Sequence, residues 1–227
     1  MFRRHDMLRI GNAGREHALA VAKDNQAIDE TLLHHVIFSN TPAIVKAQEN
    51  PRDDFLEVGF SSHLLKDGVR VRLKSEIPLN DITGIITPFD IIGLGCNCKH
   101  KRIDNSIGEL AWLAAKHGLD VGVYGSCALE LLTGLPYILP TSDIDIIVKC
   151  HTANADMVGF YNAATQASQR HGVRFDIEIL CRDGSGVKLA ELLCGGKTVM
   201  CKGLYGTELR PRENVIPAME ATRGDSL

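Results

Sequence analysis

The sequence Tyr124-Gly125-Ser126 precedes Asp143-Ile144-Asp145-Ile146-Ile147-Val148 by the length of one short helix and a loop. Side chains alternate between the faces of a strand, so Asp143 and Asp145 share one face and the isoleucines between and after them lie opposite. Two carboxylates on one face repel each other unless a cation lies between them, and Mg²⁺ takes such ligands together with water and phosphates. The turn at Gly125 and Ser126 offers backbone N–H groups and a hydroxyl to the same phosphates. The ordered motifs predict a site for a metal-bound triphosphate; an acidic strand end beside an ordinary helix cap is the alternative.

A third carboxylate is expected from the next strand, at about residues 173–181. Asp176 and Glu178 share one face of this strand, so either could complete the metal site or act as general base. Asp176 is the preferred candidate because it lies nearer the start of the strand, and solvent-facing acids on an edge strand are the alternative. Lys202, after the last strand, is a weaker candidate for phosphate binding.

The bulk composition is that of a soluble globular protein. The chain has 227 residues, of which 44% are hydrophobic and 23% charged, enough for one large domain or two small ones. A net charge of −3 gives no overall electrostatic case for nucleic acid. No segment has the apolar length of a membrane span or a signal peptide. Seven scattered cysteines, an odd number, argue for a reducing compartment. We therefore expect a cytoplasmic protein with neither a membrane nor a nucleic-acid partner.

The patterning predicts an α+β protein with two domains. A small, mainly β domain is expected over residues 1–95, because short β-like runs at 35–38, 43–47, 56–60 and 69–74 alternate with Gly, Pro and Asp. Helices alternate with strands over residues 104–210, which predicts an αβ domain with a mixed sheet. The segment 211–227 has little core signal and is expected to be a loosely held tail.

Helix boundaries in the second domain can also be predicted. Ser106-Ile107-Gly108-Glu109 has the form of a capping box, so a helix is expected to begin at Ser106. Ser126 is expected to cap the next helix, which should end at Gly134 because glycine readily adopts the left-handed terminating conformation.

The order Gly-Ser, Asp-x-Asp and a third acid on a later strand resembles the nucleotidyltransferase superfamily. Several further blocks are similar to one family, the phosphoribosyl-dephospho-CoA transferase of malonate decarboxylase, or holo-acyl-carrier-protein synthase. These blocks are Arg4-His5-Asp6-Met7-Leu8, Pro42-Ala43-Ile44-Val45-Lys46, and the run from Tyr124-Gly125-Ser126 through Glu130-Leu131-Leu132-Thr133-Gly134 to Ser142-Asp143-Ile144-Asp145. The likeness is strong over about residues 121–149 and fragmentary in the N-terminal half.

The resemblance implies a reaction and its participants. The donor would be a triphosphoribosyl-dephospho-CoA, the acceptor a serine of the acyl-carrier subunit of malonate decarboxylase, and pyrophosphate would leave. Magnesium on Asp143 and Asp145 would bridge the donor phosphates. Gly125 and Ser126 would hold the pyrophosphate. The alternatives are a nucleotidyltransferase that uses an ordinary nucleoside triphosphate, and a non-catalytic carrier-binding module in which the Asp pair is structural.

Two basic clusters are candidates for binding these partners. Arg70, Arg72 and Lys74 alternate along one predicted strand, so they form a cationic stripe opposite two inward-facing apolar residues. Acyl carriers are typically acidic, which makes the stripe and the N-terminal domain a candidate carrier-docking surface. The segment Lys99–Arg102 could instead face the triphosphate. For both clusters a solvated strand or loop is the alternative.

Overall fold

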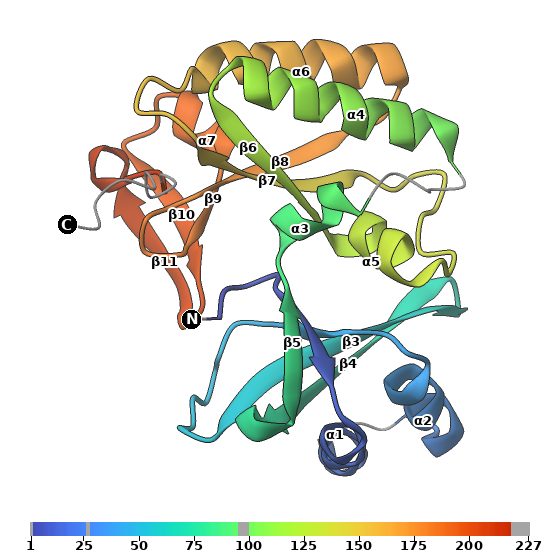
Figure 1. Ribbon diagram of the computed structural model, residues 1–227. Helices are drawn as coiled ribbons and strands as arrows, with labels where there is room; N and C mark the ends of the chain where they lie inside the picture. Colours follow the sequence, from blue (N-terminus) through green and yellow to red (C-terminus); the bar gives the residue numbers. More distant parts are fainter. Residues whose placement is uncertain (1, 26–27, 95–99, 219–227) are drawn as a thin grey trace, which may run out of the picture.

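The computed structural model describes residues 2–25, 28–94 and 100–218. These residues form two β-sheets with helices on their outer faces, and two short helices lie between the sheets (Figure 1). The first sheet is antiparallel and the second is mixed, which confirms the predicted α+β class. None of the described helices is both long and apolar enough to cross a bilayer.

The first sheet comes from the N-terminal part of the chain. Its strands are β1 (Met7–Ile10), β2 (Ala43–Val45), β3 (Phe55–Lys66), β4 (Val69–Pro78) and β5 (Ile82–Ile86), in the antiparallel order β4-β3-β2-β1-β5. Its outer face packs against α1 (Asn12–Asn25) and α2 (Glu30–Phe38) (Figure 1). The 3-10 turn Leu79–Asp81 joins β4 to β5.

The structure corrects part of the strand prediction in this region. The runs at 43–47, 56–60 and 69–74 are confirmed as strands, but residues 35–38 are the last turn of α2. Leu33, Val36 and Ile37 are buried there at helical spacing, so a short apolar run that suits a strand serves as one helix face. Strands β1 and β5 were not predicted.

The second sheet comes from the C-terminal part. Its strands are β6 (Leu119–Tyr124), β7 (Ile144–Cys150), β8 (Phe175–Leu180), β9 (Gly186–Lys188), β10 (Thr198–Gly203) and β11 (Gly206–Pro211), in sequential order. Only β7 and β8 among these neighbours are parallel. The helices of this part are α3 (Pro88–Gly93), α4 (Lys101–Lys116), α5 (Gly125–Thr133), α6 (Met157–His171) and α7 (Leu189–Leu193).

Helices α4 and α6 lie side by side over one face of the second sheet (Figure 1). In α4 the buried residues recur every three or four positions from Ile103 to Leu113, and in α6 Phe160 and Ala164 are fully buried. They pack on the apolar face of the strands, where Ile146 and Val148 are also fully buried. The opposite face of this sheet packs against α3 and the N-terminal segment.

Two helix starts differ from the prediction. Ser106 lies inside α4, where its hydroxyl donates to the carbonyl of Ile103 at 2.8 Å. The helix begins at Lys101 because Ile103 extends the buried stripe by one turn. Helix α5 begins at Gly125 with Tyr124 as N-cap, so Ser126 lies in the first turn rather than at the cap. The predicted end is confirmed, since Gly134 is left-handed with φ of 70°.

The segment after β11 is bound to the second sheet, in contrast to the expected loose tail. After the 3-10 turn Arg212–Asn214, the amide of Arg182 donates to Ile216 at 2.8 Å, and Ala218 bridges Leu180 and Cys150 through main-chain hydrogen bonds. Main-chain hydrogen bonds of this kind do not require a hydrophobic pattern, so the sequence gives no sign of them. Residues 219–227 lie outside the described part, and the predicted division into domains stays a prediction.

The contact between α3 and β6 gives a prediction about stability. A methyl group at Gly122 would lie 2.9 Å from the carbonyl carbon of Pro88 and 3.0 Å from the amide of Phe89. We expect Gly122→Ala to lower the free energy of unfolding by about 1–3 kcal/mol, because backbone must move to relieve the overlap. Urea denaturation measures this change.

Gly108→Ala is the matched control. A methyl group at Gly108, inside α4, meets nothing within 4 Å, so this variant should be more stable than wild type by about 0.5–1 kcal/mol. A Gly122→Ala protein as stable as wild type would contradict the close approach of α3.

Candidate active site

The register of three neighbouring strands brings the predicted acidic residues together. Asp145 on β7 pairs with Tyr124 at the end of β6 and with Asp176 on β8. Ile144 and Ile146 are 1% and 0% exposed in the core on the opposite face, which confirms that they and Asp145 point to opposite sides. The sheet therefore presents Asp145 and Asp176 side by side at the end where α5 begins.

Gly125 allows the two sequence motifs to touch. Its φ is +67°, and a side-chain carbon there would lie 2.0 Å from Oδ2 of Asp145. A residue with a side chain would be strained by the backbone angle and would also displace the carboxylate. Glycine is required at this position for both reasons. Because of it, the start of α5, whose first N–H groups have no partner within the helix, lies directly against the Asp145 carboxylate.

The carboxylate of Asp145 lies in an electrostatically unfavourable place. Burial and then the negative charges of Asp143, Asp176 and Glu178 raise its pKa to about 6. Asp143 pairs with Arg174 at 3.1 Å, and Asp176 pairs with Lys188 at 3.0 Å. Within the described ranges, no ion pair or hydrogen bond joins Asp145 to another side chain. The field at this point favours a bound cation.

The donor set fits a cation that is held jointly by protein and substrate. Within residues 2–25, 28–94 and 100–218, no three His, Cys, Asp or Glu side chains lie close enough to hold a metal alone. Mg²⁺ does not need such a cage, because it uses one or two carboxylates and completes its shell with water and phosphate oxygens. Asp143 and Asp145 fit this requirement, since Asp145 has no cationic partner and the pairing cation of Asp143, Arg174, is largely exposed.

Glu178 has a different environment from Asp176. Its side chain is 3% exposed, Lys202 donates to it at 2.6 Å, and Nε2 of His5 lies 3.8 Å from its Oε2. Burial alone would raise the pKa of Glu178, but His5 and Lys202 lower it to about 2. The candidate phosphate ligand Lys202 is therefore already paired. Of the two candidate third acids, Asp176 is the more accessible and lies beside Asp145.

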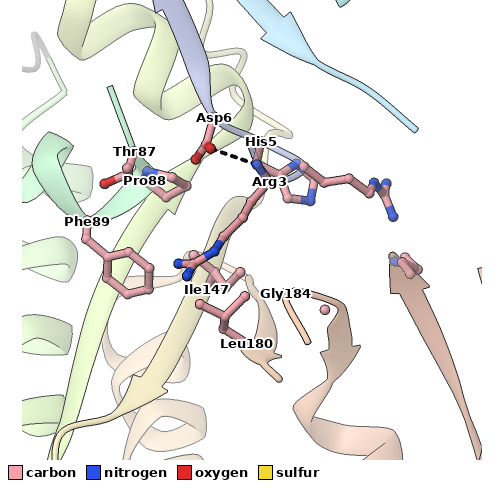
Figure 2. A pocket seen from close by; sticks show the side chains of 12 residues that line it. Arg3, His5, Asp6, Thr87, Pro88, Phe89, Ile147, Leu180 and Gly184 are labelled. Atoms are coloured by element: carbon pink, nitrogen blue, oxygen red, sulfur yellow. Dashed lines mark hydrogen bonds between the residues drawn. The ribbon is translucent and has the colours of Figure 1, made fainter. Parts of the chain in front are cut away.

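The N-terminal segment closes one side of the acidic face. The ring of His5 stacks on Tyr124 with 3.9 Å between centroids. Figure 2 shows this segment and the start of α3 around a cavity whose floor is Ile147 and Leu180 of the second sheet. Asp6 is 3% exposed and accepts the amide of Arg3 at 2.9 Å, drawn dashed in Figure 2. In the sequence, the family resemblance of the block Arg4–Leu8 was the signal that this segment belongs near the site.

A cleft between the two sheets opens beside the start of α5, and we call it the inter-sheet cleft. It has a volume of about 460 Å³, which is in the range of small-molecule sites. Its lining comprises His5, Met7, Ile44, Lys46, Gly59, Phe60, Ser61, Arg70, Arg72, Leu73, Lys74, Tyr124, Gly125, Ser126 and Leu129.

The predicted cationic stripe is on a wall of this cleft. Val71 and Leu73 are 9% and 1% exposed, so they face inward as expected. Arg70, Arg72 and Lys74 line the cleft opposite the Gly-Ser turn. The described residues of the other basic cluster, at the start of α4, do not line it, and Lys99 lies outside the described part.

Comparison with known proteins identifies the class to which this fold and site belong. The sequence model of the family described as "Phosphoribosyl-dephospho-CoA transferase MdcG C-terminal domain" matches residues 96–213, which is more than half of the chain. The chain belongs to this family. The matched range contains α5, Asp143, Asp145 and the whole second sheet.

Individual relatives agree with the family match. A Bradyrhizobium diazoefficiens protein named phosphoribosyl-dephospho-CoA transferase is 29% identical over 111 residues, which are 49% of this chain and 49% of the relative. Proteins of the same name from Xanthomonas axonopodis pv. citri and Xanthomonas campestris pv. campestris are 31% and 30% identical over 108 and 118 residues, or 50% and 54% of their own lengths. The match spans about half the length of these curated relatives. No solved structure matches the chain.

The crowding around Asp145 gives a prediction about stability and metal. Its folded pKa of about 6 is above the ordinary value of 3.8, so stability should fall as the pH rises through that interval. In EDTA at pH 8 we expect Asp145→Asn to be more stable than wild type by about 1–3 kcal/mol, and the difference should shrink towards pH 4. Chemical denaturation at the two pH values measures this. Millimolar Mg²⁺ should stabilise wild type and not the variant.

Asp120→Asn is the control for a lost negative charge on the same sheet. Asp120 has ion pairs with Lys149 at 3.6 Å and His151 at 3.5 Å, so its replacement should not stabilise the protein. If Asp145→Asn were less stable than wild type at pH 8, repulsion would not dominate at this position.

Proposed function

We propose that this chain transfers the 2'-(5''-phosphoribosyl)-3'-dephospho-CoA group from its triphosphate donor to a serine of the acyl-carrier subunit of malonate decarboxylase, with release of pyrophosphate. The contact between Gly125 and Asp145 carries the proposal, because it joins a helix start, which could bind phosphate, to a carboxylate that has no ion pair with any residue of the described ranges. Membership of the transferase family supports the choice of donor.

The start of α5 would bind the phosphates that leave. Gly125 and Ser126 lie in the first turn, where backbone N–H groups have no partner within the helix and the helix dipole favours anions. The Ser126 hydroxyl adds a further donor. These groups would stabilise the negative charge that develops on pyrophosphate in the transition state.

The transfer is a substitution at the α-phosphorus of the donor. The serine oxygen of the carrier attacks, a new O–P bond forms, and the bond from the α-phosphorus to the bridging oxygen breaks. Pyrophosphate leaves with that electron pair, and the serine proton passes to a carboxylate base. Asp176, accessible and paired across the ladder with Asp145, is the candidate for this base or for a further metal ligand.

Asp143 and Asp145 would hold Mg²⁺. When bound, the ion would neutralise negative charge on the donor phosphates. Without it, the aspartates would repel the donor, so the proposal requires that activity depend on a divalent cation.

The proposal predicts a mass change on the carrier. Apo acyl-carrier subunit incubated with this protein, Mg²⁺ and triphosphoribosyl-dephospho-CoA should gain the mass of the phosphoribosyl-dephospho-CoA group in an intact-mass measurement. Asp143→Asn and Asp145→Asn should each lower the rate by at least about a hundredfold, because each removes a carboxylate that would hold Mg²⁺. Asp120→Asn should react at the wild-type rate.

Other outcomes would point to the alternatives. Pyrophosphate release with ATP, CTP, GTP or UTP, and none with the CoA-derived donor, would indicate an ordinary nucleotidyltransferase. Carrier binding without turnover, equal in wild type and Asp145→Asn, would indicate a non-catalytic module. Near-normal transfer by either Asp variant would remove the Asp pair from the mechanism.

A further inference from the structure

Four cations line the inter-sheet cleft, and their partners distinguish them. Lys46 pairs with Glu57 at 2.7 Å and Glu49 at 3.3 Å. Lys74 also lies 3.8 Å from Glu49. These two charges are therefore largely balanced within the first sheet.

Arg70 has a structural role. It donates to the carbonyl oxygens of Ser62 and Tyr137 and stacks over the Tyr137 ring, 5.1 Å from its centroid. Tyr137 is fully buried and donates to the carbonyl of Ser61 at 2.9 Å. Arg70 thus helps to fasten the loop after α5 to the first sheet, and both of its terminal nitrogens donate to main-chain carbonyls.

Arg72 is the exception among the four. Its side chain is exposed in the cleft, and no ion pair or hydrogen bond joins it to a residue of the described ranges. Arg72 and Gly125 line the same cleft, and Gly125 lies against the Asp145 carboxylate. Arg72 therefore belongs to the first sheet but lies in the cleft that adjoins the acidic residues of the second.

Part of the lining of the cleft is apolar. Met7 and Leu129 are at most 3% exposed, and together with the partly buried Ile44 they belong to the core cluster between the two sheets. A cleft with apolar lining, a guanidinium on one wall and a helix start on the other suits a triphosphate that adjoins an uncharged group. In the proposed donor the triphosphate adjoins a ribose, which is joined to adenosine.

We propose that the inter-sheet cleft is the donor site, and that Arg72 binds the triphosphate from the side opposite Gly125 and Ser126. This inference rests on the proposed function. It assigns the cationic stripe to the donor rather than to the acidic carrier, because the stripe faces the Gly-Ser turn across the cleft. A guanidinium suits this role, since it makes paired, charge-assisted hydrogen bonds to phosphate oxygens.

The test is steady-state kinetics of Arg72→Gln with both substrates varied. We expect the KM for the donor to rise about tenfold to a hundredfold, as for loss of charge-assisted hydrogen bonds. The KM for the carrier should stay within about twofold of wild type. Arg72→Lys should recover part of the donor affinity because it restores the charge without the fork geometry.

Lys66→Gln is the matched control. Lys66 is an exposed cation on the same β3–β4 hairpin and does not line the cleft, so its loss should leave both KM values unchanged. A rise in the KM for the carrier alone in Arg72→Gln would overturn the inference and make the stripe a carrier-docking surface. Equal KM values for Arg72→Gln and wild type would also overturn it.

A binding measurement separates this inference from the proposed function. If wild type transfers nothing to the carrier, the proposed function fails, but calorimetry with inorganic tripolyphosphate and Mg²⁺ still tests the cleft. Wild type and Lys66→Gln should then bind this probe alike, and Arg72→Gln should bind it about tenfold or more weakly. Equal affinities in all three proteins would overturn the role of Arg72.

Discussion

The pairing of β7 between β6 and β8 is the constraint on which the site depends. Tyr124, Asp145 and Asp176 face each other across this ladder, so a slip by one residue would turn Asp145 into the core and bring an isoleucine to the surface. Ile144 and Ile146 oppose such a slip, because it would turn both side chains out of the core under α4 and α6. The apolar face of β7 thereby determines on which side of the sheet Asp145 lies.

The negative charges held there oppose folding, and neighbouring groups offset only some of them. Glu178 has Lys202 and His5, and Asp176 has Lys188, whereas Asp145 lacks a cation within 4 Å among the described residues. The pKa values of Glu178 and Asp145 consequently move in opposite directions, to about 2 and about 6. Glu178 anchors the N-terminal segment, while Asp145 remains poised for a cation. Asp143, Asp176 and Glu178 each have a cationic partner, whereas Asp145 has none within 4 Å among the described residues. A cluster of like charges with one uncompensated carboxylate is typical of a functional site.

The sequence predicted those parts of the molecule whose signal is local. Alternation along β7 and β8 identified the acidic face, and Gly134 marked a helix end, because both depend on residues close in the chain. Ser106 was misread as a cap, since a buried serine that donates to its own helix has the same sequence as a capping one. The close approach of Gly125 to Asp145 and the pairing of Lys202 with Glu178 could not be read at all. They follow from the order of strands, which no single segment encodes.

The role of the first sheet shows most clearly what tertiary structure adds. From the sequence, Arg70, Arg72 and Lys74 form one stripe of equivalent charges. In the fold they differ, because Arg70 fastens the loop after α5, Lys74 lies near Glu49, and Arg72 has no ion pair or hydrogen bond to a residue of the described ranges. The guanidinium of Arg72 lines one wall of the cleft, and the carboxylate of Asp145 lies against Gly125 of the other wall; such a pair would attract a molecule that carries both phosphate and a metal ion. Under the proposed function, the second sheet would supply ligands for the metal ion and the first would supply a cation for the phosphates, so neither sheet alone would contain the complete site.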